Sequence, residues 1–494
     1  MRNLAYIMLL SLLASFFACS DDFDDYSISS NDILTFSLDT VRFDTILSTI
    51  NTPYTTLKVY NKNSKSLLIS SIGLRDGDQG FKINVDGQAG SYFQNIEIRS
   101  KDSIYIFIDA LPSESGQNLP FFFEDHIEFM TNGVGQEVVL EGSSQDVEIY
   151  QGKEITVNSI LSNNKPYLIY DSLVIREGST LSIQEGATLY MYNNAEIIVE
   201  GTLNIQGTPD SFVHIRGHRT DKMNTIPYEY VPGQWGGIRF SATSYNNKIE
   251  YAHIRNGNYG MNFDPSETMN TKLEMNNVIL TNFKGDLINA INCKIIANNC
   301  ELSNARGTLL NLIGGDYTFA HCTVVNLYES PTQWGWGNSD NRTVYLSDTY
   351  TSEEGEKTIY PLQQADFKNT LIWGRKYRTS SGVSLSSEKS ATMNYYFLNC
   401  LLPNQGENDN DFVNCLFAEE PIFVKDDITT LKDPENPAAG EKYDFVYNLR
   451  LDSVSPLIDR GDWTTARTLP FDLDNKSRIS DGGPDIGAYE YSSQ

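Results

Sequence analysis

Apolar and polar residues alternate in short runs over the first third of the chain. Leu57–Asn61 alternates, and so do Ile96–Arg99 and Ile104–Ile108. A period of two is typical of strands that bury one face. Three dipeptides that favour turns separate such runs: Asp76-Gly77, Asp86-Gly87 and Asn132-Gly133. The pattern predicts an immunoglobulin-like β-sandwich over 33–150, although the Cys…Trp…Cys core of antibody domains is missing.

From about Gln151 the apolar runs become shorter and glycine interrupts them more often. Leu173–Ile175, Leu181–Ile183 and Leu203–Ile205 are three-residue runs, each followed closely by a Glu-Gly or Gln-Gly pair. Strands this short cannot enclose a sandwich core. Coiled into a solenoid, each strand pairs with its equivalent in the next turn.

A dipeptide made of one polar residue and one small or apolar residue recurs through this region. It occurs at His253-Ile254, Asn277-Val278, Asn299-Cys300, His321-Cys322, Asn369-Thr370, Asn399-Cys400 and Asn414-Cys415. The first four are spaced by 24, 22 and 22 residues, which is about one coil of a parallel β-helix. We therefore predict a right-handed parallel β-helix of roughly ten to twelve coils over 151–430, closed by a segment at 431–494.

The cysteines fall on the repeat. Cys300, Cys322, Cys400 and Cys415 occupy its second position, which predicts an inward-facing ladder of small side chains. A disulfide between Cys300 and Cys322 is the alternative. Cys293 lies off the ladder and is expected to be exposed or paired. The neighbouring Asn side chains are expected to form a hydrogen-bonded ladder at a turn.

Several segments resemble pectin-lyase-like right-handed β-helix proteins. They are Glu177–Leu189, Val199–Leu203, Gln234–Ile238, Glu420–Phe423, Leu449–Leu451, Ser455–Gly461 and Asp485–Glu490. The resemblance covers about 151–494. It implies the fold but no particular activity, since this superfamily includes lyases, hydrolases, adhesins and non-enzymes.

The N-terminus resembles that of a bacterial lipoprotein. Arg2 precedes an apolar run at 4–17, and Ala18-Cys19 follows. We interpret 1–18 as a signal peptide, with cleavage before Cys19 and lipid attachment and acylation at that cysteine. An ordinary signal with a chance cysteine is the alternative. The tether at 19–32 is acidic, and resembles surface-export signals, so we expect an outer-membrane protein that faces outwards.

The formal net charge of −27 narrows the possible partners. It argues against nucleic acid and against peripheral binding to anionic lipid, both of which need a basic face. The predicted membrane contact is through the lipid anchor alone. We expect a polysaccharide or an envelope protein as partner.

Two sets of residues are candidate sites. Trp334, Trp336, Tyr345 and Trp373 are the carbohydrate-binding candidates, because aromatic rings stack on sugars; alternatively, the tryptophans pack onto the flank of the solenoid. Asp472, Asp474, Asp481 and Asp485 are oxygen ligands suited to Ca²⁺. A capping loop in which Arg478 pairs with a carboxylate is the alternative. No other cofactor is expected.

Three functions follow from this pattern. The first is a non-catalytic surface lipoprotein that binds polysaccharide or another envelope component through the β-helix flank and its loops. The second is a polysaccharide lyase or glycoside hydrolase, although the resemblance then implies stacked acidic residues beside an Arg or Lys, which we do not recognise. The third is a structural or adhesive stalk with a protein partner.

Overall fold

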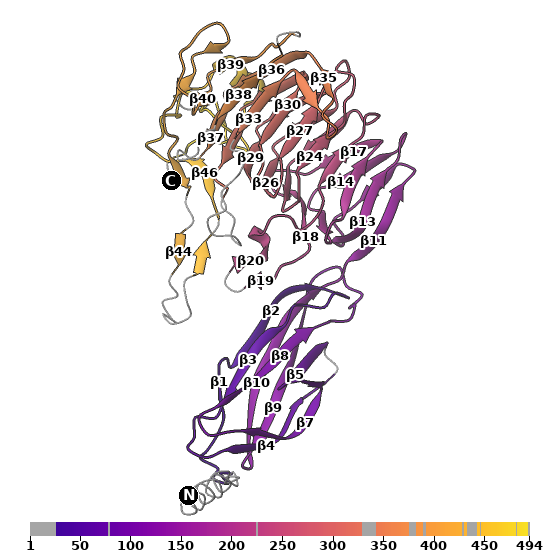
Figure 1. The fold of residues 1–494 in the computed structure, drawn as a ribbon, viewed down its shortest axis with the longest axis vertical. Coiled ribbons are helices and arrows are strands. Elements are labelled where there is room, and N and C mark those ends of the chain that lie inside the picture. Colours follow the sequence, from indigo (N-terminus) through magenta and orange to yellow (C-terminus); the bar gives the residue numbers. More distant parts are fainter. Residues whose placement is uncertain are drawn as a thin grey trace, which may run out of the picture. The chain divides into compact units, whose positions relative to one another are not determined.

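The computed structural model divides the chain into two compact units, one ending at Asp146 and the other beginning at Val147 (Figure 1). The structure describes residues 26–77, 80–223, 226–328, 342–374, 382–388, 392–426, 429–431, 442–444, 446–480 and 482–492.

The first unit is a β-sandwich. One sheet has the order β1-β3-β8-β5-β6 and the other has the order β2-β10-β9-β4-β7. Their bounds are β1 Thr35–Phe36, β2 Thr40–Leu47, β3 Thr55–Tyr60, β4 Leu67–Leu74, β5 Phe81–Val85, β6 Gln88–Gly90, β7 Tyr92–Ile98, β8 Ser103–Ala110, β9 Phe121–Thr131 and β10 Val134–Gln145.

The predicted alternation places one face of each sheet in the sandwich core. Leu57 and Val59 of β3 are fully buried, as are Ile106 and Ile108 of β8. Two-residue turns join neighbouring strands: Asn132-Gly133, both at positive φ, links β9 to β10. The immunoglobulin-like sandwich is therefore confirmed.

The second unit is a right-handed parallel β-helix built from three ladders of strands. Ladder A consists of β16 Glu196–Val199, β21 Ile238–Phe240, β24 Met261–Phe263, β27 Ile288–Ile291, β30 Leu310–Ile313, β33 Val344–Ser347 and β38 Val383–Ser386. Ladder B consists of β15 Thr188–Met191, β18 Val213–Gly217, β23 Ala252–Arg255, β26 Ile279–Phe283, β29 Glu301–Ala305, β32 Thr323–Asn326, β37 Leu371–Gly374, β40 Leu401–Leu402 and β42 Leu416–Phe417. Ladder C consists of β12 Ser159–Leu161, β14 Thr180–Gln184, β17 Thr202–Gln206, β22 Asn247–Glu250, β25 Leu273–Asn276, β28 Lys294–Asn298, β31 Gly315–Ala320, β36 Leu362–Lys368, β39 Tyr396–Leu398 and β41 Phe412–Val413.

Ladders A and B join at the N-terminal end of the solenoid. The strands β11 Glu148–Ile155 and β13 Tyr167–Ile175 pair along most of their length, and β13 then pairs with both β15 and β16. The remaining elements are β19 Lys222–Met223, β20 Ile226–Pro227, η1 Tyr228–Tyr230, β34 Thr349–Thr351, β35 Lys357–Ile359, β43 Phe423–Lys425, β44 Thr429–Leu431, β45 Lys442–Asp444, β46 Asn448–Leu451 and α2 Trp463–Thr468.

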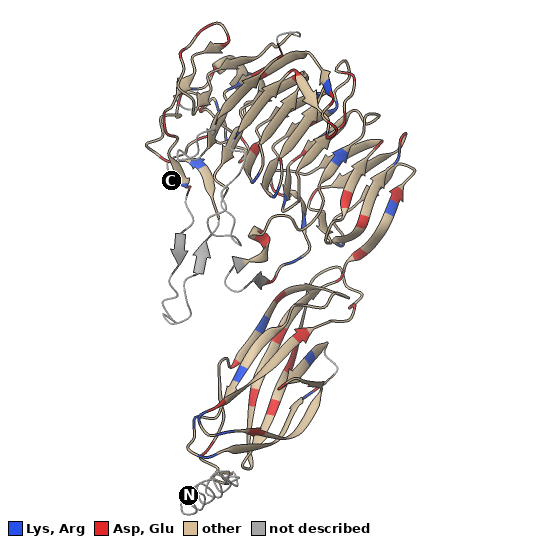
Figure 2. Ribbon diagram, viewed as in Figure 1, with Lys and Arg blue, Asp and Glu red and all other residues tan. Residues whose placement is uncertain are grey.

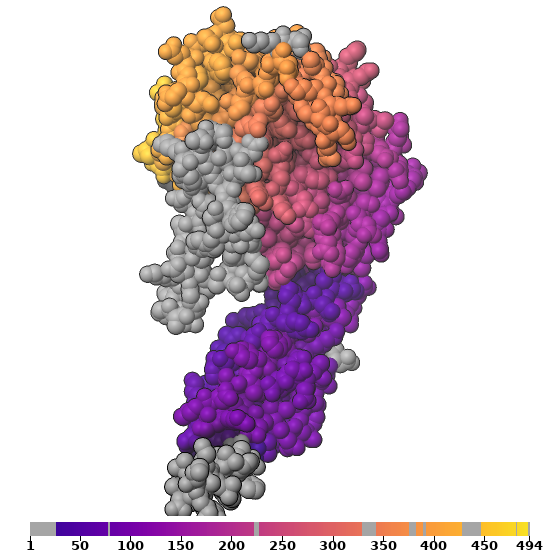
Figure 3. Space-filling model, viewed as in Figure 1, coloured from indigo at the N-terminus to yellow at the C-terminus, as the bar shows by residue number. Residues whose placement is uncertain are grey.

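Each strand of the solenoid pairs in parallel with its equivalent one coil later. In ladder C, for example, β25 pairs with β28 and β28 with β31. Figure 3 shows the consequence: colours that follow the sequence succeed one another in bands across this unit. The parallel β-helix predicted from the repeat is therefore confirmed.

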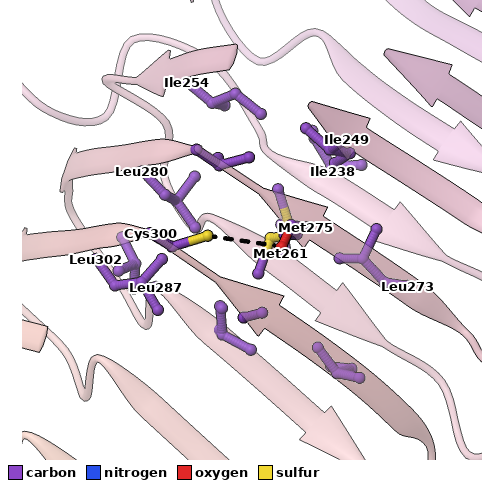
Figure 4. Close-up of a cluster of buried hydrophobic side chains, with 14 of the residues drawn as sticks. Ile238, Ile249, Ile254, Met261, Leu273, Met275, Leu280, Leu287, Cys300 and Leu302 are labelled. Atoms are coloured by element: carbon purple, nitrogen blue, oxygen red, sulfur yellow. Dashed lines mark hydrogen bonds between the residues drawn. The ribbon is translucent and has the colours of Figure 1, made fainter. Parts of the chain in front are cut away.

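The interior of the solenoid is apolar and continuous. Figure 4 shows Cys300 pointing inwards among Leu280, Leu287 and Met275. Removing each such side chain from water contributes roughly 1.5–3 kcal/mol. All five cysteines of the solenoid are free and buried. Cys293 is thus neither exposed nor in a disulfide, contrary to expectation, because it lies inside beside Tyr317.

The ladder of small residues stacks as predicted from Val278 onwards. Each thiol donates to a backbone carbonyl two residues before it: Cys300 Sγ to Asn298 O at 3.2 Å, and Cys400 Sγ to Leu398 O at 3.4 Å. Thr370 occupies the same row and its hydroxyl donates equivalently to Lys368 at 3.1 Å. A small side chain with a donor therefore suits this position.

The polar residue before each ladder position adopts a left-handed conformation. The φ angles of Asn277, Asn299, His321, Asn369, Asn399 and Asn414 lie between 49° and 59°. Asparagine tolerates this conformation better than most residues, which explains the repeat. The predicted first member, His253-Ile254, is wrong: His253 pairs with Ile279, and Tyr251 occupies the turn, with a φ of 47°.

The asparagine side chains of this row bind the C-terminal strap, which we define as residues 457–480 and 482–492. Asn299 donates to Phe471 O at 3.0 Å, and Asn369 donates to Asp462 O at 3.0 Å. Asn399 donates to Arg460 O at 2.7 Å. The strap therefore runs back along the row from later coils to earlier ones. Most of the asparagines bond to the strap, instead of to each other as expected.

We expect Asn299→Ala to loosen the C-terminal strap. The substitution removes a residue suited to positive φ and two side-chain hydrogen bonds, to Phe471 O and from Arg478. The free energy of unfolding should fall by about 2–3 kcal/mol. Asn246→Ala is the matched control, since Asn246 has a φ of 57° but lies on an exposed turn away from the strap. Hydrogen exchange of residues 457–480 should accelerate in Asn299→Ala alone. Equal exchange in both variants would contradict the role of the strap.

Candidate functional site

The outward-facing centre of ladder A carries one polar row across five consecutive coils. Register places Arg239 beside Asn262, Asn262 beside Asn289, Asn289 beside Asn311, and Asn311 beside Tyr345. Figure 1 shows β24, β27, β30 and β33 side by side. In each strand the neighbours of the row residue are buried, so this residue alone points to solvent at the strand centre.

The row is a regular array of donors and acceptors. Asn311 Nδ2 donates to Asn289 Oδ1 at 2.8 Å, which orients both amides. Each amide keeps a further donor or acceptor for a ligand. In Figure 2 the strands of the middle coils carry few charged residues. The array is therefore suited to uncharged hydroxyl groups rather than to ions.

A charged cluster lies at the N-terminal end of the row. Arg239 pairs with Asp264 at 3.0 Å, and the Tyr259 hydroxyl donates to Glu196 at 3.1 Å. Burial, together with the Glu196 carboxylate, raises the pKa of Tyr259 above its usual range. This cluster combines two carboxylates with a cation, and sequence reasoning missed it.

Two glycines allow this cluster to pack. A Cβ at Gly236 would lie 2.2 Å from Glu196 Cγ, and one at Gly237 would lie 2.4 Å from the Tyr259 ring. Between them and ladder B, Trp235 is fully buried and its indole nitrogen donates to Arg255 O at 2.8 Å. The segment 234–237, noted in the sequence, therefore allows the charged cluster to pack closely beside the row.

The structure separates the predicted carbohydrate-binding residues. Tyr345 lies in the polar row, between Asn311 and Ser384, with the Arg342 guanidinium 4.5 Å from its ring centre. Trp373 is only 6 % exposed and packs in a cluster with Leu449 and Leu451. Its prediction as a sugar platform is wrong, because no face of the ring is open. Trp334 and Trp336 lie outside the described residues.

The predicted Ca²⁺ ligands serve the C-terminal strap. Asp472 accepts backbone N–H groups from Lys476 at 2.6 Å and Glu490 at 2.7 Å. Asp474 receives two hydrogen bonds of 2.6 Å from Arg450.

Asp485 completes this set in the same manner. It accepts N–H groups from Asp459 at 2.8 Å and Tyr491 at 2.6 Å. Buried Arg478 pairs with Glu490 at 2.5 Å. Among the residues that the structure describes, no group of three acidic, His or Cys side chains is arranged to hold a metal. Asp481 lies outside them.

The predicted lipidation site, Cys19, also lies outside the described residues. Within the described part of the chain, no helix has the length and apolar character needed to cross a bilayer.

Comparisons with known proteins do not assign this chain to a family. No family model matches the chain, and no curated protein matches it. Among solved structures, the Vibrio cholerae VesB protease is 7 % identical, with a TM-score of 0.17 over 22 % of this chain and 31 % of that one. The periplasmic chaperone SfaE is 16 % identical (TM-score 0.16; 22 % and 56 %), and the E. coli chaperone DraB is 12 % identical (TM-score 0.16; 23 % and 54 %). The matched parts span less than two thirds of these proteins, and likenesses at these scores carry no argument.

Buried His321 makes the strap region sensitive to acid. Asn369 Nδ2 lies 2.9 Å from His321 Nε2, so the imidazole accepts this bond and is neutral. Burial, with Arg478 nearby, lowers the pKa of His321 well below 6.5. The unfolded chain therefore binds a proton below pH 6.5 that the folded chain does not, and stability is lost as the pH falls through this range.

We expect His321→Asn to reduce this loss. Asparagine occupies the same turn in neighbouring coils and does not titrate. We compare the slope of the free energy of unfolding against pH, measured by urea denaturation between pH 6 and pH 5. This slope should be smaller in His321→Asn than in the unsubstituted protein by about 1 kcal/mol per pH unit. Asn399→Ala, at the same turn in a later coil, is the control: it alters the turn but no titrating group and should leave the slope unchanged. Identical slopes in all three proteins would show that His321 titrates normally.

Proposed function

We propose that this protein binds a polysaccharide along the outer face of ladder A without cleaving it. The observation that carries the proposal is the row Arg239, Asn262, Asn289, Asn311 and Tyr345, which presents one polar side chain per coil. The lipid anchor expected at Cys19 would tether the chain to the outer membrane. That part of the proposal rests on the sequence.

The spacing of the row suits a linear polymer. Neighbouring parallel strands lie about 4.8 Å apart, so the five residues extend over about 19 Å along the solenoid axis. Amides hydrogen-bond hydroxyl groups in both directions, and an aromatic ring supplies an apolar face. A chain of sugars lying along the axis meets the same kind of group at every coil.

The row is preorganised. The bond from Asn311 to Asn289 and the packing of both strands fix these amides before a ligand arrives. Fixed donors lose little conformational entropy on binding, which strengthens otherwise modest polar contacts. The sheet therefore favours binding through many weak contacts that are repeated along the polymer.

The charged cluster supports an alternative function, that of a polysaccharide lyase or hydrolase. Asp264 and Glu196 supply carboxylates, Arg239 supplies a cation, and Tyr259 supplies a hydroxyl at the end of the same row. Proton transfer to or from a bound sugar needs groups of this kind within reach. We favour binding because both carboxylates already have a partner within the cluster.

Glycan-array binding tests the proposal. The double variant Asn289→Ala/Asn311→Ala should bind its glycan about 10- to 30-fold more weakly, since two hydrogen bonds of about 1 kcal/mol each are lost. Tyr345→Ala should also weaken binding. Thr318→Ala, on the outer face of ladder C, is the control and should bind normally.

The outcomes separate the functions. Binding to no glycan, or equal binding by the double variant and Thr318→Ala, would rule out the row as a glycan site. Incubation of the bound glycan with the protein distinguishes the alternative. Shortened products that disappear in Tyr259→Phe would show an enzyme.

A further inference from the structure

A second polar group lies on the outer face of ladder B, near the N-terminal end of the solenoid. Tyr190 on β15 lies beside Arg216 on β18, and Arg255 on β23 occupies the next position of the same row. In the adjacent row, His214 lies beside His253, with their ring centres 6.0 Å apart. Four basic side chains therefore share two neighbouring strands.

One carboxylate faces these groups. Glu229 of η1 lies 3.6 Å from Arg216 Nη1 and 3.1 Å from Arg255 Nη2. Arg219 and Asp221, nearby in the same loop, neutralise each other at 2.5 Å. Two guanidinium groups thus share one carboxylate, and the cluster keeps an excess of one positive charge in a chain whose net charge is −27.

Arg216 and Arg255 make different hydrogen bonds and therefore have different roles. Arg216 also donates to Gly217 O at 3.3 Å and Arg219 O at 3.1 Å, so it holds the loop. Arg255 uses one terminal nitrogen for Glu229, which leaves donors on its other nitrogens for a ligand. Its side chain is 18 % exposed, and that of Arg216 is 14 % exposed. A small ion can therefore reach the pair.

The pKa values of the two histidines reflect the positive potential around them. Burial lowers the pKa of His214 and His253, and the two guanidinium groups lower both further. Buried His253 Nε2 has no hydrogen-bond partner among the described residues. The phenol of Tyr190 faces the same arginines, and burial raises its pKa. A buried His253 nitrogen without a partner, beside an uncompensated cation, forms an environment that an anion would stabilise.

We infer that Arg255, Arg216, His253 and Tyr190 form a binding site for a tetrahedral oxyanion, that is, a sulfate or phosphate group. The planar carboxylate position between the arginines is already taken by Glu229. The remaining donors come from three strands, and a tetrahedral ion offers oxygens in more directions than a second carboxylate does. The group reaches the site either as the free ion or as an ester on a polymer. This inference is independent of the glycan row, which lies on another ladder.

Equilibrium dialysis of the full chain with radiolabelled sulfate, and separately phosphate, tests the inference at constant ionic strength. We expect saturable binding of one ion per chain at millimolar concentration or below. Arg255→Gln should weaken it at least tenfold. Arg42→Gln is the matched control, because Arg42 is likewise paired with one carboxylate but lies in the β-sandwich. It should bind normally.

Glu229→Gln gives a result that a structural role for the cluster would not produce. Removing the competing carboxylate should tighten binding about tenfold, the size expected for one charge at about 4 Å. Non-saturable binding, equal binding by Arg255→Gln and Arg42→Gln, or unchanged affinity in Glu229→Gln would each overturn the inference. Dextran sulfate, with neutral dextran as control, identifies the source. Displacement of labelled sulfate by dextran sulfate alone assigns the site to a polymer ester, and no displacement assigns it to the free ion.

Discussion

Parallel pairing of each strand with its equivalent one coil later is the constraint on which the rest of this structure depends. No strand of ladders A, B or C exceeds seven residues, so none could bury a core alone. Stacking the coils buries a continuous apolar interior and satisfies the backbone of every inner strand. It also converts residues far apart in sequence into straight rows. Both proposed sites are such rows, and neither exists without the register.

The turn before ladder B made the fold readable from the sequence. That turn requires a left-handed residue followed by a small inward one, and asparagine with cysteine or threonine meets both needs, as at Asn299-Cys300 and Asn369-Thr370. The rule failed once, where Tyr251 occupies the turn and His253-Ile254 imitates the signature two residues later. Conformation at one backbone position, not composition, explains both the success and the failure.

The sites could not be predicted in the same way. Asn262, Asn289, Asn311 and Tyr345 are spaced by 27, 22 and 34 residues because loops of different length separate their strands. Arg216 and Arg255 are 39 residues apart because the loop that carries Glu229 intervenes. Only the pairing of the strands, which the sequence does not show, reveals that such residues are aligned. Trp373 was misjudged for a related reason: the segment that buries it, including Leu449 and Leu451, arrives from much later in the chain.

Stacking is tested most directly by a distance between two positions of the same row. Nitroxide labels at positions 262 and 384 are 122 residues apart in sequence and four coils apart in ladder A. At about 4.8 Å per coil, pulsed electron spin resonance should give one narrow distribution centred near 20 Å. The unsubstituted chain, treated with the same label, gives the background from its native cysteines. A broad distribution, or one centred beyond about 35 Å, nearly twice the stacked spacing, would contradict the solenoid and both rows built on it.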